Sequence, residues 1–124
     1  MARELSLAEI FQLGYYWETK ILLTAVKLDV FSQLAEKPLH VSELAKSLQA
    51  HDRTLGLVLN ALVAMRLLTK EGDRYANTAV ASKHLVKGGA HYVGHLLVLH
   101  DAEWSNWGKL EEAGRTGHSS VTQH

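Results

Sequence analysis

Histidine is the residue type most able to do chemistry in this sequence, which has eight histidines and no cysteine. His91 and His95 are four residues apart, a spacing that places two imidazoles on one helical face where a metal ion could bridge them. A zinc site usually needs three or four protein ligands, and no third ligand is evident. His84 lies across a glycine turn and His100 lies beyond His95, so neither has to converge on the pair. We therefore predict no metal site.

His100 differs from the other histidines because it falls on an apolar stripe of a predicted helix. A buried polar ring needs a hydrogen-bond partner, so His100 is either a satisfied residue of a core or interface, or a group that faces a substrate. Trp104 and Trp107 pose the same choice, being either packing anchors or flat walls for an aromatic ligand. The stripe consists of Val93, Leu96, Leu97, His100, Trp104 and Trp107.

The glycine-rich stretch at 87–94 is the one candidate for a phosphate or cofactor loop, because bare amides can approach an anion there. It does not follow a predicted buried strand, as such a loop would. A connection between two helices is the favoured interpretation. We expect no cofactor to bind this chain.

Composition indicates one soluble domain with balanced charge. The 124 residues are 47% hydrophobic, and 13 basic residues offset 13 acidic ones. One core can be built from this, and no net field attracts nucleic acid or an anionic membrane. The start of the chain lacks a signal-like apolar run, and the longest apolar runs fall far short of the roughly 20 residues that span a bilayer. Without cysteine, a cytoplasmic location is favoured.

Two long helices are predicted near the ends of the chain. Ser6 and Glu9 have the spacing of a capping box, and an apolar stripe follows over 7–28. Gly14 marks either a break in this helix or a close helix contact. The last helix is predicted over 91–113, where further glycines end it.

A winged helix-turn-helix is predicted between these helices. Ser42 and Asp52 are the expected N-caps of two helices that a three-residue turn separates. Gly72 can take the positive φ that a three-residue hairpin loop requires. The predicted elements are a helix from 42 to 48, a turn at 49–51, a helix from 52 to about 68, and wing strands at 67–70 and 74–77.

The apolar stripes of the first and last helices are longer than a small winged core can cover. That core can close with Leu44, Leu48, Leu55, Leu59, Leu62 and Tyr75. Soluble monomers rarely expose a contiguous apolar patch beyond about a few hundred Å². Twofold self-association hides such a patch on both copies, so we predict a homodimer held by the first and last helices.

This order of elements resembles the N-terminal domain of bacterial and plant small-molecule O-methyltransferases, over nearly the whole chain. The resemblance lies in Gly14-Tyr15-Tyr16-Trp17, Ala25-Val26-Lys27-Leu28-Asp29-Val30-Phe31, Leu44-Ala45, Arg53-Thr54-Leu55, Leu59-Asn60-Ala61-Leu62-Val63-Ala64-Met65-Arg66-Leu67-Leu68, Trp104, Trp107, Leu110 and Thr116-Gly117. The implied fold is mainly α: a winged helix-turn-helix with a small β-hairpin wing, whose long N- and C-terminal helices form an intertwined dimer.

The resemblance also implies a function. Such a domain dimerises and helps to wall the acceptor pocket, while a following Rossmann-like domain binds S-adenosylmethionine and carries the catalytic base. We therefore expect a winged-helix dimerisation domain over 1–117 and a polar tail or linker over 118–124, leading to a catalytic domain that this sequence lacks. The chain alone is expected to be inactive and to hold no catalytic residue, with S-adenosylmethionine bound by the full-length parent.

Site residues follow from the same resemblance. The residues expected to bind the acceptor, a small aromatic or polyketide-like molecule in the parent, are Tyr16, Trp17, His100, Trp104 and Trp107. The residues expected at the dimer interface are Phe11, Ile21, Leu97 and Trp104.

Two other functions are consistent with this pattern. A winged helix-turn-helix also describes a DNA-binding transcriptional regulator, whose second helix exposes polar and basic side chains to base edges. Between 55 and 68 only Asn60 and Arg66 are strongly polar, and acids offset the bases of the motif and wing. We therefore predict no specific nucleic-acid partner and no membrane partner. The chain could also be a ligand-binding or adaptor dimer in its own right.

Overall fold

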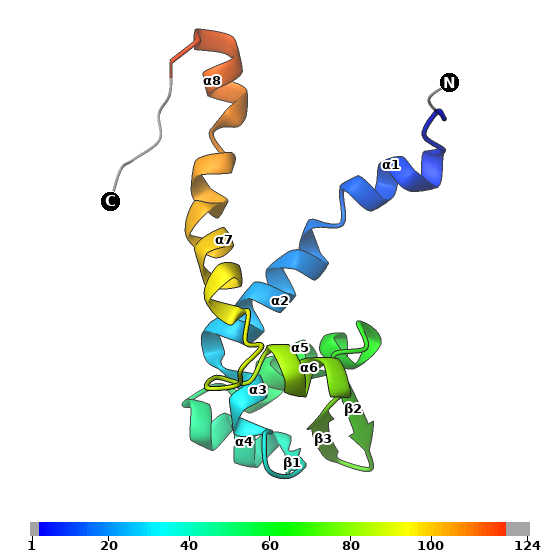
Figure 1. Cartoon of the computed structure of the whole chain (residues 1–124), viewed down its shortest axis with the longest axis vertical. Helices are drawn as coiled ribbons and strands as arrows, with labels where there is room; N and C mark the ends of the chain where they lie inside the picture. The colour runs from blue at the N-terminus through cyan, green and yellow to red at the C-terminus, as the bar shows by residue number, and fades with distance from the viewer. Residues whose placement is uncertain (1–2, 119–124) are drawn as a thin grey trace.

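The computed structural model describes residues 3–118, which form a winged-helix unit and two helical arms that diverge from it (Figure 1). One arm is α1 with α2, and the other is α7 with α8. The elements are α1 (Leu7–Leu13), α2 (Tyr16–Leu28), α3 (Val30–Gln33), β1 (Leu39–His40), α4 (Val41–Leu48), α5 (Asp52–Ala64), β2 (Leu68–Glu71), β3 (Arg74–Asn77), α6 (Ala79–His84), α7 (Gly94–Trp107) and α8 (Leu110–Thr116). The predicted mainly α fold is confirmed.

The predicted turn between α4 and α5 and the wing behind them are both present. Gln49 ends α4 with a left-handed φ of 54°. The wing loop has two residues rather than the predicted three, because Glu71 pairs directly with Arg74. Gly72 has a φ of 59°, which explains the glycine at the first central position of this tight hairpin. α5 ends earlier than predicted because Arg66, with a φ of 66°, turns the chain into β2.

Histidine side chains cap both helices of the helix-turn-helix. Nδ1 of His40 accepts a hydrogen bond from the backbone N–H of Ser42 at 3.1 Å, and Nδ1 of His51 accepts one from that of Thr54 at 3.4 Å. The prediction that Ser42 and Asp52 are the N-caps is wrong, since each lies inside the first turn. A ring nitrogen with a free lone pair accepts an amide hydrogen as a hydroxyl or carboxylate oxygen would.

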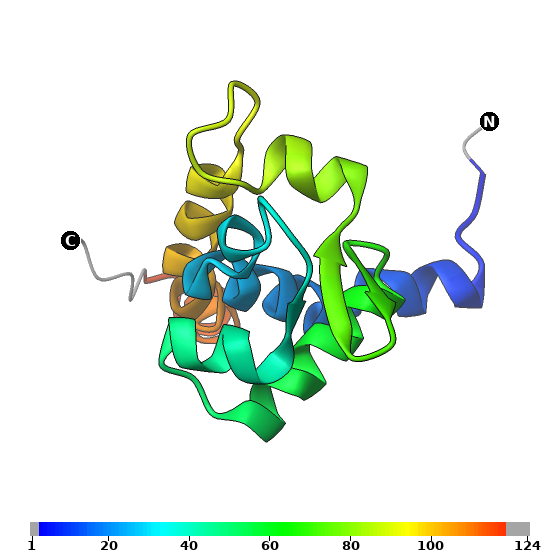
Figure 2. The same ribbon diagram turned by 90° about the horizontal axis from the view of Figure 1, so that it is seen from below.

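The core lies between the base of α2, helices α3 to α6 and one face of a small antiparallel sheet of strand order β1-β3-β2. Figure 2 shows these elements gathered around the foot of the arms. Tyr75 of the central strand is buried, and its hydroxyl donates a hydrogen bond to Oδ1 of Asn60 on α5. Of the predicted core residues, five are buried and Leu48 packs against them at the edge; the five are Leu44, Leu55, Leu59, Leu62 and Tyr75.

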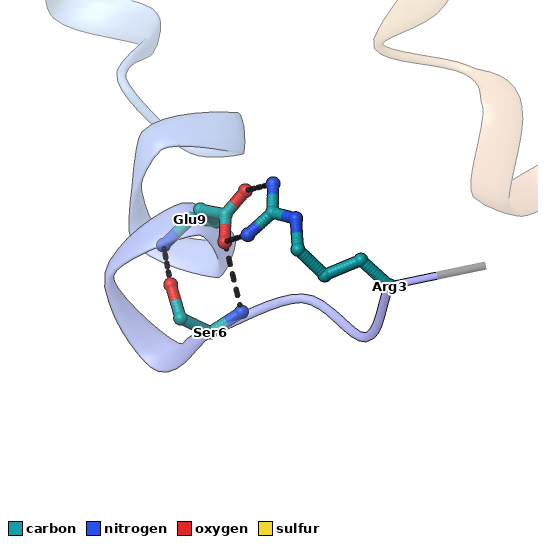
Figure 3. Close-up of polar contacts among 3 residues, drawn as sticks. All are labelled: Arg3, Ser6 and Glu9. Atoms are coloured by element: carbon teal, nitrogen blue, oxygen red, sulfur yellow. Dashed lines mark hydrogen bonds and ion pairs between the residues drawn. The ribbon is translucent and has the colours of Figure 1, made fainter. Parts of the chain in front are cut away.

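The N-terminal arm is broken at Gly14, which settles the choice left open by the sequence in favour of a break. The predicted capping box is present: the Ser6 hydroxyl accepts from the N–H of Glu9 at 3.1 Å, and Glu9 accepts from the N–H of Ser6 at 3.2 Å (Figure 3). Arg3 adds two hydrogen bonds of 2.9 Å to the Glu9 carboxylate, and these bonds and those of Ser6 lower the pKa of Glu9. No residue of α1 is buried, so the core does not cover this helix.

The C-terminal arm is two helices rather than the single helix predicted over 91–113. α7 begins at Gly94 and ends at Trp107 with Gly108 as its C-cap, and α8 then continues the arm. Glycine is a poor helix former, so the break falls where the helix is weakest. No helix within residues 3–118 has the length and apolar character needed to cross a membrane. The predicted tail lies, from residue 119 onward, outside the described residues.

Replacing His40 with alanine removes the acceptor for a first-turn amide of α4. We expect the free energy of unfolding to fall by about 1 kcal/mol, measured by chemical denaturation at one protein concentration. His40→Asn, whose side-chain oxygen can accept the same bond, should retain most of the stability. His118→Ala, an exposed histidine outside any cap, is the control. An alanine variant at position 40 as stable as the unmodified chain would contradict the capping role.

Candidate functional site

One carboxylate joins the two arms where α2 packs against α7. Asp101 of α7 accepts a hydrogen bond from Nζ of Lys20 at 2.6 Å and another, on its second oxygen, from Nζ of Lys27 at 2.8 Å. The Asp101 side chain is 9% exposed, whereas the two lysines are about half exposed. The hydrogen bond from Lys20, followed by that from Lys27, lowers the pKa of the Asp101 carboxyl below its ordinary value of 3.8. The carboxylate therefore stays charged and holds α7 to two points of α2.

Trp104 lies one turn beyond Asp101 on α7. Nζ of Lys20 is 5.0 Å from the centroid of the Trp104 ring, within the range of a cation–π interaction. The indole is half-buried, and it lines two pockets that have no other residue in common. Trp104 is therefore a wall that both pockets share.

The larger pocket, here called the α7 pocket, has a volume of about 530 Å³. Its lining residues are Thr19, Leu23, His100, Glu103, Trp104, Trp107 and Gly108. Most of the wall is apolar and aromatic, and Thr19, His100 and Glu103 add a few polar groups. Small-molecule sites commonly have this composition. The arrangement suits a flat aromatic molecule that carries hydroxyl groups, which would stack on the indoles and hydrogen-bond to the polar side chains.

The second pocket, here called the α2 pocket, has a volume of about 460 Å³. It is lined by Tyr16, Trp17, Lys20, Ile21, Thr24, Val58 and Trp104. The rings of Tyr16 and Trp17 meet edge to face with centroids 5.4 Å apart, and Tyr15 lies 5.0 Å from Trp17. Tyr16 is 66% exposed and Trp17 is 48% exposed, so this aromatic cluster faces away from the core.

The five residues predicted to bind the acceptor are not brought into one site. His100, Trp104 and Trp107 line the α7 pocket, whereas Tyr16 and Trp17 line the α2 pocket together with Trp104. His100 is exposed, so it is not a core residue. Trp107 is 70% exposed, which shows that the indole is not a packing anchor within its own chain.

Two polar residues of the α7 pocket were not predicted. Glu103 lies three residues after His100 and four before Trp107, so helical spacing alone places it on the same face. Thr19 has no comparable signal in the sequence, because it belongs to α2. Only the packing of α2 against α7 brings it to the pocket.

The residues predicted at the dimer interface lie in three environments. Phe11 is 61% exposed on α1, Ile21 and Leu97 are half-buried against the core of their own chain, and Trp104 lies between the pockets. Many other apolar side chains of the arms are exposed, among them Leu7, Ile10, Leu13, Tyr16, Trp17, Leu96, Val98, Leu99, Trp107 and Leu110. The apolar surface of the arms is therefore wider than the four predicted residues.

The histidines around the start of α7 serve the loop that precedes it. Nδ1 of His84 lies 2.9 Å from the carbonyl oxygen of His91, a geometry in which the ring donates the hydrogen bond. The ring of His95 lies 5.9 Å from that of Tyr92. Within residues 3–118, no three side chains of metal-binding type are grouped so that they could hold an ion.

Helix α5 occupies the position of a DNA-reading helix but is turned toward the core. Leu55, Leu59 and Leu62 are buried, and the side chain of Asn60 is engaged by the hydroxyl of Tyr75 from the wing. DNA recognition requires polar groups that are free to meet base edges in the major groove. Helix α5 therefore places its buried leucines in the core, and Asn60 is bonded to the wing.

The chain is similar to known methyltransferases. Residues 11–87 match the family described as O-methyltransferase dimerisation domain. The chain is 40% identical over 108 residues to the tetracenomycin polyketide synthesis 8-O-methyl transferase TcmO of Streptomyces glaucescens. This match covers 86% of this chain and 32% of TcmO.

Solved structures give the same result. An O-methyltransferase family protein from Burkholderia thailandensis has a TM-score of 0.80 at 30% identity, over 94% of this chain and 35% of that one. Human N-acetylserotonin methyltransferase, in complex with SAM, has a TM-score of 0.78 at 27% identity, and the match covers 95% of this chain and 37% of that one. The chain spans about a third of the length of these relatives. Because the family match covers more than half of its residues, the chain belongs to the O-methyltransferase dimerisation domain family.

Proposed function

We propose that this chain forms a homodimer through its two arms and supplies part of the acceptor pocket of an S-adenosylmethionine-dependent O-methyltransferase. The observation that carries the proposal is the apolar surface of the arms, which the core of the chain leaves uncovered. Membership of a family defined by dimerisation supports the same function.

Helix α1 gives the strongest argument for a second copy of the chain. It has seven residues and none is buried. Isolated helices shorter than roughly 12–15 residues are marginal in water, so local capping alone does not account for this helix. Leu7, Phe11 and Leu13 are 67%, 61% and 79% exposed, respectively. Pairing the same surface of two copies around a twofold axis would cover these side chains on both at once.

The α7 pocket supports the role in acceptor binding. Trp104 and Trp107 offer indole faces on which an aromatic ring can stack, while His100 and Glu103 can hydrogen-bond to its hydroxyl groups. The relative TcmO is named for polyketide synthesis, so we propose an aromatic or polyketide-like acceptor. These polar groups are assigned to binding and orientation, and no catalytic residue is assigned to this chain.

Cofactor binding is assigned to another part of a full-length protein. The relatives are about three times as long as this chain, and the human one was solved with SAM. Rossmann-like cofactor sites lie at the carboxyl ends of parallel strands, whereas the sheet within residues 3–118 is antiparallel. Bound elsewhere in the parent, S-adenosylmethionine would supply the methyl group.

A charge placed on the arms should separate the dimer. Burying an unpaired charge costs several kcal/mol, so Phe11→Asp and Leu99→Asp should each shift the chain toward the monomer, which light scattering measures. Leu57→Asp is the matched control, because Leu57 is 65% exposed on α5 and Leu99 is 57% exposed on α7.

Ile21 and Leu97 are poor choices for this test, since both also pack against the core of their own chain. If the unmodified chain is monomeric at tens of micromolar, or if both arm variants remain dimeric, the proposed interface is wrong.

Binding of 1-naphthol, a hydroxylated aromatic probe, tests the α7 pocket. Trp107→Ala should weaken its affinity about two- to tenfold, the range expected when one aromatic stacking partner is lost, and Trp107→Phe should recover most of it. Calorimetry measures the affinity without relying on tryptophan emission. Trp17→Ala, in the α2 pocket, should leave the affinity unchanged. Equal losses at positions 17 and 107 would refute the assignment.

S-adenosylmethionine should not bind the 124-residue chain. Titration calorimetry is expected to show no specific heat of binding, because the described residues contain no parallel sheet on which the cofactor could be held. One-to-one binding with micromolar affinity would show that cofactor binding does not require another domain.

A further inference from the structure

We propose that Asp101 is a positioning residue for the acceptor site: by holding Lys20 against Trp104, it fixes the indole that the α7 pocket and the α2 pocket share. The consequence for acceptor binding rests on the proposed function. The positioning itself is a property of this chain that can be measured without a ligand.

The contacts of Lys20 carry the argument. Its ammonium group is 2.6 Å from Oδ1 of Asp101 and 5.0 Å from the ring centroid of Trp104. A lysine side chain is flexible, and that of Lys20 is 46% exposed, so the ring alone would hold the ammonium weakly. Asp101 is a firm anchor because it is only 9% exposed and its other oxygen is bonded to Lys27. Contacts thus run from Lys27 through Asp101 and Lys20 to Trp104.

Asp101 lies between the part of α7 that packs against the core and the exposed end of the helix. One turn before it, Leu97 packs against the core. Six residues beyond it, Trp107 is 70% exposed and is the last residue of α7. Trp104 lies between Leu97 and Trp107 along the helix, is half-buried, and lines both the α7 pocket and the α2 pocket. Open space in the two pockets borders this indole, so we infer that the cation held 5.0 Å from its ring centroid restricts the orientation of the ring.

Tryptophan fluorescence tests the positioning directly. The chain has three tryptophans, so Trp17→Phe with Trp107→Phe leaves Trp104 as the only tryptophan, which is then excited selectively at the red edge of its absorption. In this background, Asp101→Asn should reduce the population of the held indole rotamer about two- to fivefold, the effect expected from losing an exposed cation–π contact. Time-resolved anisotropy would report this as increased fast motion. Asp101→Glu, which keeps the carboxylate, should restore part of the order.

Two lysine variants separate positioning from general damage. Lys20→Met should reproduce the effect of Asp101→Asn on Trp104, and combining the two should add nothing further. Lys27→Met leaves the bond between Lys20 and Asp101 in place and should change the anisotropy much less. If circular dichroism shows that Asp101→Asn reduces the helical content, the Lys20→Met variant is used for the comparison instead. In that variant Asp101 is still paired with Lys27.

The proposal is overturned if Trp104 is equally ordered in the unmodified chain, in Asp101→Asn and in Lys20→Met at equal helical content. In the chain with all three tryptophans, Asp101→Asn should also weaken 1-naphthol binding severalfold at an unchanged mass by light scattering. Unchanged affinity would overturn the consequence for the site. If the unmodified chain does not bind 1-naphthol, the proposed function fails, while the anisotropy results still decide the positioning role.

Discussion

A winged core of this size can bury only the lower half of α2, and that limit shapes the rest of the molecule. Leu23, Ala25 and Val26 are buried, whereas every residue from 11 to 20 is exposed. Helix α2 therefore runs on past the core, and α7, which packs against its base, projects with it (Figure 1). The domain consequently still presents apolar side chains along two arms, which is the surface that we propose a second copy covers.

The arms are held at their junction by charge as well as by apolar contact. Asp101 accepts from Lys20 and Lys27 at a point where the apolar packing of Leu97 ends and the arms begin to separate. A nearly buried carboxylate with two cationic donors fixes the geometry of the junction more sharply than apolar contact alone, because hydrogen bonds are directional. Trp104, one turn beyond this junction, lines both pockets.

The helix-turn-helix serves here as a scaffold. Its second helix directs Leu59 and Leu62 inward, and the wing reaches back to it through the hydrogen bond between Tyr75 and Asn60. The ion pair between Arg74 and Glu43, 3.2 Å long, neutralises charge that a DNA-binding surface would use to attract phosphates. The same residues that complete the core thus also tie the helix-turn-helix to the wing.

The sequence by itself determined the elements whose signals are local. Helical periodicity identified core residues such as Leu59, and glycine at position 72 identified the wing hairpin, because these features depend on a few neighbouring residues. The family resemblance followed from the order of these elements. Tertiary structure decided the rest. A glycine costs a helix only about 1 kcal/mol, so the break at Gly108 depends on surroundings that spacing does not reveal. The division of the aromatic residues between two pockets, and the bond between Lys20 and Asp101 across 81 positions, depend on how two distant helices pack, which no local pattern encodes.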